Sequence, residues 1–256
     1  MVIKLNSRGE DVKKIQSVIG CGQDGIFGKT TEKSVKNWQK NHGLTADGIV
    51  GNETWYKMFG TYYGQLNKTV LYNPISVHIT KSNNRQIKYL VIHYTAGKTS
   101  KPGTAASERK VFLNCSSSAD FCVDDRDIIQ INPDPRNNYC WAVGDGKGKY
   151  GVTNANSIHI EMCSYLDNGT NVNIPNHCGW HVTDAVVDKT VALAKDIMKE
   201  YNIPLKNVIR HYDASKKLCP GIIGWNDGVI YDAITGKATS KKNNNTEWDK
   251  FKSRLS

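Results

Sequence analysis

The chain has 256 residues, of which 39% are hydrophobic and 23% are charged. This composition is typical of a globular protein with one large domain or two smaller ones, and no apolar run approaches the ~20 residues of a membrane span. The formal net charge of +10 indicates a polyanionic partner or environment. We expect no nucleic-acid partner, because the sequence has no helix-turn-helix, RRM or zinc-finger pattern. An anionic cell envelope is another candidate partner. Alternatively, the positive charge only aids solubility.

The N-terminal segment, MVIKLNSRGEDVKK, lacks the apolar core of a secretory signal. We therefore expect synthesis and folding in a cytoplasm. An odd number of cysteines, seven, argues against a complete disulfide framework. Most of them should be buried and reduced, although Cys115 and Cys122 could pair outside a cell.

The first sixty residues contain an internal repeat, DGIFGKTT at 24–31 and DGIVGNET at 47–54. The Asp-Gly pair in each copy suits a tight turn that needs a positive φ. The threonine that closes each copy, Thr31 or Thr54, can cap the helix that follows. Apolar periodicity predicts three helices, over residues 10–19, 30–41 and 53–59.

The layout GEDVKKIQ…DGIFGKTTEKSVKNWQKNHGL…DGIVGNETW resembles the peptidoglycan-binding domain of cell-wall hydrolases. The resemblance covers residues 6–59 and implies a non-catalytic, three-helix module over 1–60 that targets the wall. The alternative is that its turns and tryptophans serve only its own fold. Residues 61–74 are predicted to be a linker.

Strand and helix patterns are mixed in the rest of the chain, residues 75–256. Apolar segments predict strands over 88–95, 119–125, 127–132, 156–163 and 207–212. Helices are predicted over 105–114, over 183–201 with Thr183 as its cap, and near the end around Trp248 and Phe251. Strands interspersed with helices, without regular βαβ repetition, predict an α/β fold with a central mixed sheet flanked by helices.

The segment RHYDASKKLCPG, residues 210–221, places His211 eight residues before Cys219. Such a pair can be a nucleophile with its base, or two soft ligands of one metal ion. Pro220 and Gly221 fit a turn better than the helix start that would activate a catalytic thiol. His93, at the polar end of an apolar strand, offers a third metal ligand, and three protein ligands with an open fourth position are typical of catalytic zinc.

Three segments, VIHYTA at 91–96, SIHIEMC at 157–163 and RHYDASKKLCPG, resemble the zinc-dependent N-acetylmuramoyl-L-alanine amidases of the type-2 family. That family shares its fold with animal peptidoglycan recognition proteins, and the resemblance spans about residues 85–221. It implies one zinc ion held by His93, His211 and Cys219. It also implies that Glu161 is the catalytic carboxylate and Lys217 a second catalytic residue.

In these roles zinc activates a water and polarises the scissile carbonyl. Glu161 carries the proton from the water to the leaving amine, and Lys217 stabilises the oxyanion. From the residues alone, Glu161 could equally be a solvated carboxylate and Lys217 an ordinary surface lysine. His159, on the same strand face as Glu161, is a weaker candidate for lining the cleft.

The sequence departs from the family near the expected substrate groove. Where many relatives have Ser-Ala-His-Tyr, this chain has Ser-Ala-Asp-Phe at 118–121, and a common Trp-His pair is Trp141-Ala142. These differences leave the accepted stem peptide or glycan decoration open. Asp120, Trp141 and Asn156 are the candidate substrate-binding residues.

The resemblance implies hydrolysis of the bond between N-acetylmuramic acid and L-alanine in bacterial peptidoglycan. A monomer is the default expectation for the oligomeric state. A lytic domain, a binding domain and no secretory signal resemble an endolysin, which acts on the wall after release from the cytoplasm. The basic surface then suits anionic wall polymers. The alternatives are a host autolysin with the same chemistry, a recognition protein that binds without cutting, and a cysteine peptidase using Cys219 and His211.

Overall fold

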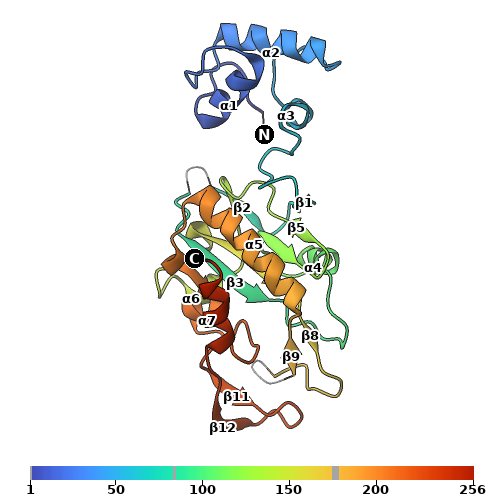
Figure 1. Ribbon diagram of the computed structural model, residues 1–256, viewed down its shortest axis with the longest axis vertical. Helices are drawn as coiled ribbons and strands as arrows, with labels where there is room; N and C mark the ends of the chain where they lie inside the picture. Colours follow the sequence, from blue (N-terminus) through green and yellow to red (C-terminus); the bar gives the residue numbers. More distant parts are fainter. Residues whose placement is uncertain (1, 83–84, 175–178) are drawn as a thin grey trace. The chain divides into compact units, whose positions relative to one another are not determined.

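The computed structural model describes residues 2–82, 85–174 and 179–256 (Figure 1). The chain divides into two compact units, Met1–Lys68 and Thr69–Ser256. The division falls inside residues 61–74, the predicted linker. Leu71 and Tyr72 nevertheless form strand β1 of the main sheet, so the end of that segment belongs to the fold of the second unit.

The first unit contains three helices, α1 (Glu10–Ile19), α2 (Lys29–Asn41) and α3 (Asn52–Phe59). They lie where the apolar periodicity predicts them. Their core is small and consists of Ile3, Val12, Ile15, Phe27, Val35, Val50 and Trp55. A unit of this size buries little apolar surface, so its polar contacts carry more of its stability.

The internal repeat builds the same buried hydrogen-bond network twice. Gln16 Nε2 donates to Asp24 Oδ1 at 2.7 Å and to Thr31 Oγ1 at 3.2 Å. In the second copy, Gln39 Nε2 makes the same bonds to Asp47 (3.0 Å) and Thr54 (3.1 Å). Each glutamine also accepts a bond from a turn glycine, Gly25 or Gly48. The repeat is therefore a turn fastened to the preceding helix by one buried glutamine.

These networks correct the prediction that Thr31 and Thr54 cap the following helices. Both threonines lie inside the first turn of their helices, whose N-cap residues are Gly28 and Gly51. The hydroxyl of each threonine is engaged by the buried glutamine instead. Gly25 and Gly48 do have the positive φ expected of the turns, 73° and 77°.

The second unit is built on a six-stranded sheet in the order β1-β5-β4-β7-β3-β10. Its strands are β1 (Leu71–Tyr72), β3 (Tyr89–Tyr94), β4 (Phe121–Val123), β5 (Ile128–Gln130), β7 (Ser157–Met162) and β10 (Val208–Arg210). Only the β4–β5 pair is antiparallel among these strands. The sheet is therefore mixed, as predicted.

Helices flank this sheet (Figure 1). Helix α5 (Asp184–Tyr201) packs against β3, β4 and β7, and Thr183 caps it by accepting a bond from Val186 N, as predicted. Helix α4 (Ala105–Phe112) contacts β4 and β5, and the short α6 (His211–Ser215) contacts β3 and β10. The last helix, α7 (Thr246–Ser253), buries Trp248 and Phe251.

Smaller elements lie around the sheet. The short strands pair as β2 (Ile79–Lys81) with β6 (Asn138–Cys140), β8 (Tyr165–Leu166) with β9 (Trp180–His181), and β11 (Val229–Tyr231) with β12 (Ala238–Lys242). Within the described ranges, three single turns are 3₁₀-helical: η1 (Gly144–Gly146), η2 (Asn154–Asn156) and η3 (Leu205–Asn207). No helix among the described residues combines the length and apolar character needed to cross a bilayer.

The register of β3 and β7 places three ionisable side chains on one face of the sheet. His93 lies opposite Glu161, and Val91 lies opposite His159. Paired residues of parallel strands project to the same face and successive residues to opposite faces. His93, His159 and Glu161 therefore share a face, while the fully buried Ile92 and Ile160 project to the other.

The six cysteines within the described residues are free thiols, and Cys178 lies outside those residues. Four of them are buried, as predicted: Cys122, Cys140, Cys163 and Cys219. Cys115 and Cys122 do not form the disulfide that their spacing left open.

Candidate metal centre

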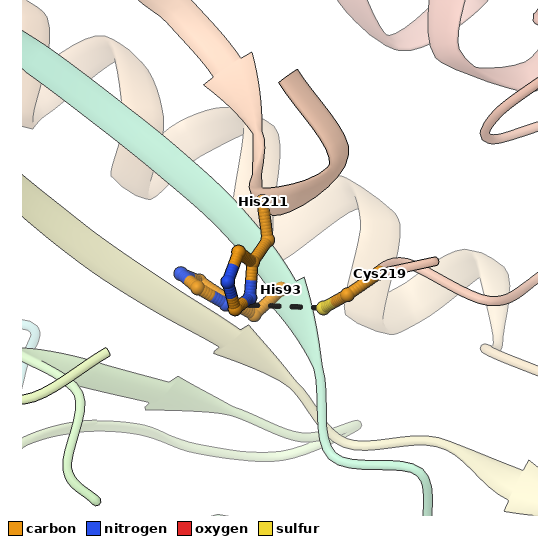
Figure 2. A group of neighbouring side chains, drawn as sticks. All are labelled: His93, His211 and Cys219. Carbon is orange, nitrogen blue, oxygen red and sulfur yellow. Dashed lines mark hydrogen bonds between the residues drawn. The ribbon is translucent and has the colours of Figure 1, made fainter. Parts of the chain in front are cut away.

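The three predicted metal ligands meet at one end of the sheet (Figure 2). His93 lies near the end of β3, His211 begins α6 directly after β10, and Cys219 lies in the loop beyond α6. One potential ligand atom from each residue lies within 4.8 Å of the others, and all three residues are buried. Residues 126 positions apart in the chain are thus brought together by the parallel strands.

A partly buried ion pair fixes the turn that carries His211. Arg210 Nη2 donates to Asp213 Oδ1 at 2.7 Å, and its Nε donates to the other oxygen at 2.9 Å. Asp213 also accepts the backbone N–H of Arg210, which starts helix α6 at His211. Tyr212 N donates to Cys219 O at 2.9 Å, so the cysteine loop is tied to the same turn.

Each histidine uses one ring nitrogen for a partner inside the protein. His93 Nε2 lies 3.1 Å from His159 Nδ1, and His211 Nε2 lies 2.9 Å from Asp145 Oδ1. His93 Nδ1 faces the thiol, 3.8 Å from Cys219 Sγ (Figure 2). The Nδ1 atoms are therefore the nitrogens left for a metal, and two imidazole nitrogens with one thiolate are a donor set that suits zinc.

Asp145 is a site residue that the sequence does not reveal. It lies in η1, and its two oxygens interact with His211 Nε2 and with the hydroxyl of Ser215. Burial alone would raise the pKa of Asp145, but hydrogen bonds with His211 and Ser215 and the positive charge of Lys217 help to lower it below its ordinary value. An ionised carboxylate is thus held behind the second histidine.

Burial governs protonation in the cluster itself. It lowers the pKa of His93 well below its ordinary value and also lowers the pKa of His211, so both rings are neutral at neutral pH. Burial, followed by the negative charge of Glu161, raises the pKa of the Cys219 thiol. Neutral imidazoles are metal ligands, whereas the thiol needs a nearby cation to ionise.

Glu161 lies beside this cluster on β7. Its Oε1 atom is 3.9 Å from His93 Nδ1, and its Oε2 atom is buried without a hydrogen-bond partner among the described residues. Burial and then the charge of Glu108 raise the pKa of Glu161 well above its ordinary value, while Lys217 lowers it. An unpartnered buried oxygen of this kind is available to a ligand.

A cavity of about 480 Å³ opens onto the cluster. His93, His211, Cys219 and Glu161 line it, and so does the exposed side chain of Lys217. Its apolar walls come from Val111, Phe112, Val172, Ile174, Leu218 and Trp180. The predicted ligands and both predicted catalytic residues therefore line one pocket.

Glu108, on α4, is a second cavity residue that sequence reasoning missed. Its carboxylate forms no hydrogen bond or ion pair with the part of the chain that the structure describes, and burial raises its pKa to about 7. In the sequence it is one charged residue of a short helix. Only the packing of α4 on β4 and β5 turns it toward the site.

The structure corrects the prediction for Asp120. This residue is fully buried and does not line the cavity. Its Oδ2 accepts the backbone N–H of His159 at 2.8 Å, and its Oδ1 accepts a bond from Asn132 Nδ2 at 2.6 Å. One oxygen is therefore occupied by strand β7 and the other by the segment after β5, so neither is free for a substrate.

Asn156 is also corrected. Its side chain accepts a bond from Thr153 N at 2.8 Å and donates to Gly151 O at 2.9 Å, so it stabilises its own turn instead of lining the cavity. His159 is fully buried beneath His93 and does not line the cavity either. The sequence does not distinguish polar residues that line a groove from polar residues that form hydrogen bonds with backbone groups.

Trp141 stays a prediction. Its side chain is 41% exposed, and its indole N–H donates to Thr80 Oγ1 at 2.9 Å. Trp141 is not itself among the residues lining the cavity, but its neighbour Ala142 is. Trp141 is therefore adjacent in sequence to a cavity residue, and its exposed indole is accessible to a ligand.

Fold and site together define an α/β protein with a candidate mononuclear metal centre at one end of a mixed sheet. The family model for N-acetylmuramoyl-L-alanine amidase matches residues 83–222, and the model for the peptidoglycan binding domain matches residues 5–58. The chain belongs to the N-acetylmuramoyl-L-alanine amidase family and carries a peptidoglycan-binding domain ahead of the amidase domain. Both resemblances drawn from the sequence motifs are confirmed.

Individual relatives match part of the chain. The N-acetylmuramoyl-L-alanine amidase CwlH of Bacillus subtilis (strain 168) is 35% identical over 134 residues, which are 52% of this chain and 46% of that protein. XlyB of the same organism is 31% identical over 168 residues, 62% of this chain and 47% of its own length. The chain thus spans about half the length of these curated relatives.

Solved structures are similar as well. A mutant endolysin from Bacillus subtilis is 28% identical with a TM-score of 0.49, over 73% of this chain and 98% of that one. The catalytic domain of XlyA is 26% identical with a TM-score of 0.48, over 73% of this chain and 99% of that one.

Proposed function

We propose that this chain is a zinc-dependent amidase that hydrolyses the bond between the N-acetylmuramoyl group and L-alanine in bacterial peptidoglycan. The observation that carries the proposal is the meeting of His93, His211 and Cys219 within 4.8 Å, beside the unpartnered oxygen of Glu161. Membership of the amidase family supports the choice of bond.

The donor set fits zinc. Each histidine has its Nε2 engaged and its Nδ1 available, and the thiol of Cys219 faces the same point. Zinc held by three protein ligands supplies Lewis-acid chemistry, which activates water at neutral pH and polarises a carbonyl. Three ligands leave one position open for that chemistry.

Glu161 is the proton carrier in this proposal. Its Oε2 atom accepts a proton from the attacking water and delivers it to the nitrogen of the departing L-alanine. Its buried position and the neighbouring charge of Glu108, which raise its pKa, make the carboxyl group hold that proton between the two transfers.

Lys217 contributes positive charge from the cavity wall. Its ammonium group forms no hydrogen bond or ion pair with the described residues and is free to face a substrate oxygen. Charge placed where an oxyanion develops stabilises the transition state by about 3 kcal/mol in comparable sites. The apolar walls exclude water around the scissile amide, and Trp141 is a proposed contact at the rim.

Two observations disfavour the cysteine-peptidase alternative. Cys219 follows α6 in a loop and does not begin a helix, and burial raises the pKa of its thiol. A nucleophilic cysteine needs a depressed pKa. Cys219 is also one of the three donors of the metal cluster, which a recognition protein without catalysis would not require.

The N-terminal domain holds the enzyme on its polymer in this proposal. Its match to the peptidoglycan-binding family supports peptidoglycan as the partner. The net charge of +10 adds a longer-range attraction to anionic wall polymers, which salt would screen. We propose that the chain acts as a monomer and as an endolysin, on the wall after leaving the cytoplasm.

The test is a cleavage assay on purified peptidoglycan. The full chain should release stem peptides from the muramoyl groups of the glycan, each with a new L-alanine amino terminus that end-group labelling detects. A chelator should abolish release and added zinc should restore it. Cleavage that survives metal removal would contradict the zinc mechanism, and binding without any cleavage would favour a recognition protein.

A further inference from the structure

His159 is the buried histidine that the proposed mechanism leaves without a role. It projects from β7 to the same face as His93, is fully buried, and does not line the cavity. Its Nδ1 lies 3.1 Å from His93 Nε2, and its Nε2 lies 3.1 Å from Ser157 Oγ. His159 therefore connects a candidate metal ligand to the protein interior.

The donor and the acceptor in each of these hydrogen bonds follow from the hydroxyl group of Ser157. Ser157 Oγ donates to Thr153 O at 2.5 Å, and a carbonyl oxygen can only accept. The single hydroxyl hydrogen is thus used, so Ser157 Oγ must accept from His159 Nε2–H. A neutral imidazole with its proton on Nε2 has a lone pair on Nδ1, which accepts from His93 Nε2–H.

We propose that His159 is a positioning residue, which uses this Ser157–His159–His93 chain to fix the His93 tautomer with Nδ1 unprotonated and turned toward Cys219. The inference rests on the metal site proposed above. The two histidine ligands are then oriented differently: His211 by the carboxylate of Asp145, and His93 by a neutral imidazole. A partner behind a metal-bound histidine typically changes metal affinity by 10–100-fold.

Two buried or partly buried side chains, those of Asp120 and Arg85, hold the backbone of Ser157 and His159 in place. Asp120 Oδ2 accepts the backbone N–H of His159 at 2.8 Å, and Arg85 donates a short hydrogen bond to the carbonyl of Ser157. Asp120, Ser157 and His159 are all fully buried. Strand β7 is therefore fixed at both Ser157 and His159, the two residues of this hydrogen-bond series that it carries.

A matched pair of variants separates the hydrogen bond from packing. Asn places an amide oxygen close to the position of histidine Nδ1, whereas Leu has nearly the same shape and accepts no bond. Zinc affinity of the full chain, measured by competition with a chromophoric chelator, should fall about tenfold or more in His159→Leu and much less in His159→Asn. Circular dichroism establishes that both variants are folded.

A second measurement needs no variant. In metal-free wild-type chain with ¹⁵N-labelled histidines, long-range proton–nitrogen spectra should show the His93 proton on Nε2. A proton on Nδ1 of His93 would overturn the inference, as would equal zinc affinity in His159→Leu and wild type. Failure of the wild-type chain to bind zinc would instead overturn the proposed metal site, and this inference with it.

Discussion

His93 and Glu161 lie directly opposite each other on neighbouring parallel strands, with Nδ1 of the first 3.9 Å from Oε1 of the second. The strand register thus sets the proposed metal ligand and the proposed proton acceptor side by side. Because both strands lie inside the sheet, the backbone pairing keeps the two residues opposite each other.

Glu161→Gln should separate metal binding from turnover. The amide keeps the shape of the side chain but cannot take up a proton, so release of L-alanine amino termini should fall by about 100-fold or more. Zinc content, measured by elemental analysis, should stay at the wild-type value. Glu200→Gln, which changes a surface carboxylate paired with Arg136, is the control and should alter neither quantity. Near-normal turnover in Glu161→Gln would remove Glu161 from the mechanism.

Asp145→Ala should weaken zinc binding by about 10–100-fold, because His211 loses the carboxylate that orients its ring. The chain offers a matched control. Asp167 lies 3.1 Å from His181 in a comparable but exposed pair, so Asp167→Ala should leave the zinc dissociation constant unchanged. Equal effects of the two substitutions would show that the Asp145 contact does not support the metal site.

Glu108 gives a pH-dependent prediction for stability. Burial raises its pKa from 4.5 to about 7 in the folded chain, so between these two values the native state binds more protons than the unfolded state. The free energy of unfolding should therefore fall as pH rises through this window. Glu108→Gln removes that penalty.

The measurement is the melting temperature of Glu108→Gln relative to wild type at pH 4 and pH 8. The melting temperature of the variant minus that of wild type should be larger at pH 8 than at pH 4. A change of 1 kcal/mol corresponds to about 2–4 °C for a domain of this size. A difference between the two proteins that is the same at both pH values would contradict the raised pKa.

Gln39→Leu should destabilise the N-terminal domain by about 1–3 kcal/mol, because it leaves Gly48 N and the Asp47 carboxylate without their buried partner. Gln16→Leu should act alike in the first copy of the repeat. Urea denaturation of the full chain, followed by tryptophan fluorescence, measures the change. Gln23→Leu, at an exposed position, is the control, and a loss of stability as large as that of Gln39→Leu would argue against the network.

The sequence predicted those parts of the site that depend on local pattern. The apolar strand patterns placed His93 at the polar end of one strand and Glu161 within another, and the Pro-Gly turn placed Cys219 outside a helix. The helices and the mixed sheet followed from periodicity in the same way. These features are determined by neighbours close in the chain.

The remaining site residues depend on contacts between distant segments. Asp145 and His211 are 66 positions apart, and so are His93 and His159. Asp120 and Asn156 are groove candidates in the sequence because they lie near the expected substrate groove, but a polar residue there can face either a ligand or the backbone. Only the folded structure shows that both satisfy backbone groups.

X-ray absorption spectroscopy of the zinc-loaded full chain tests the central claim most directly. We predict one zinc per chain with a single sulfur ligand at about 2.3 Å and two imidazole nitrogens at about 2.0–2.1 Å. A spectrum without a sulfur neighbour, or a folded chain that retains no zinc, would contradict a centre formed by His93, His211 and Cys219.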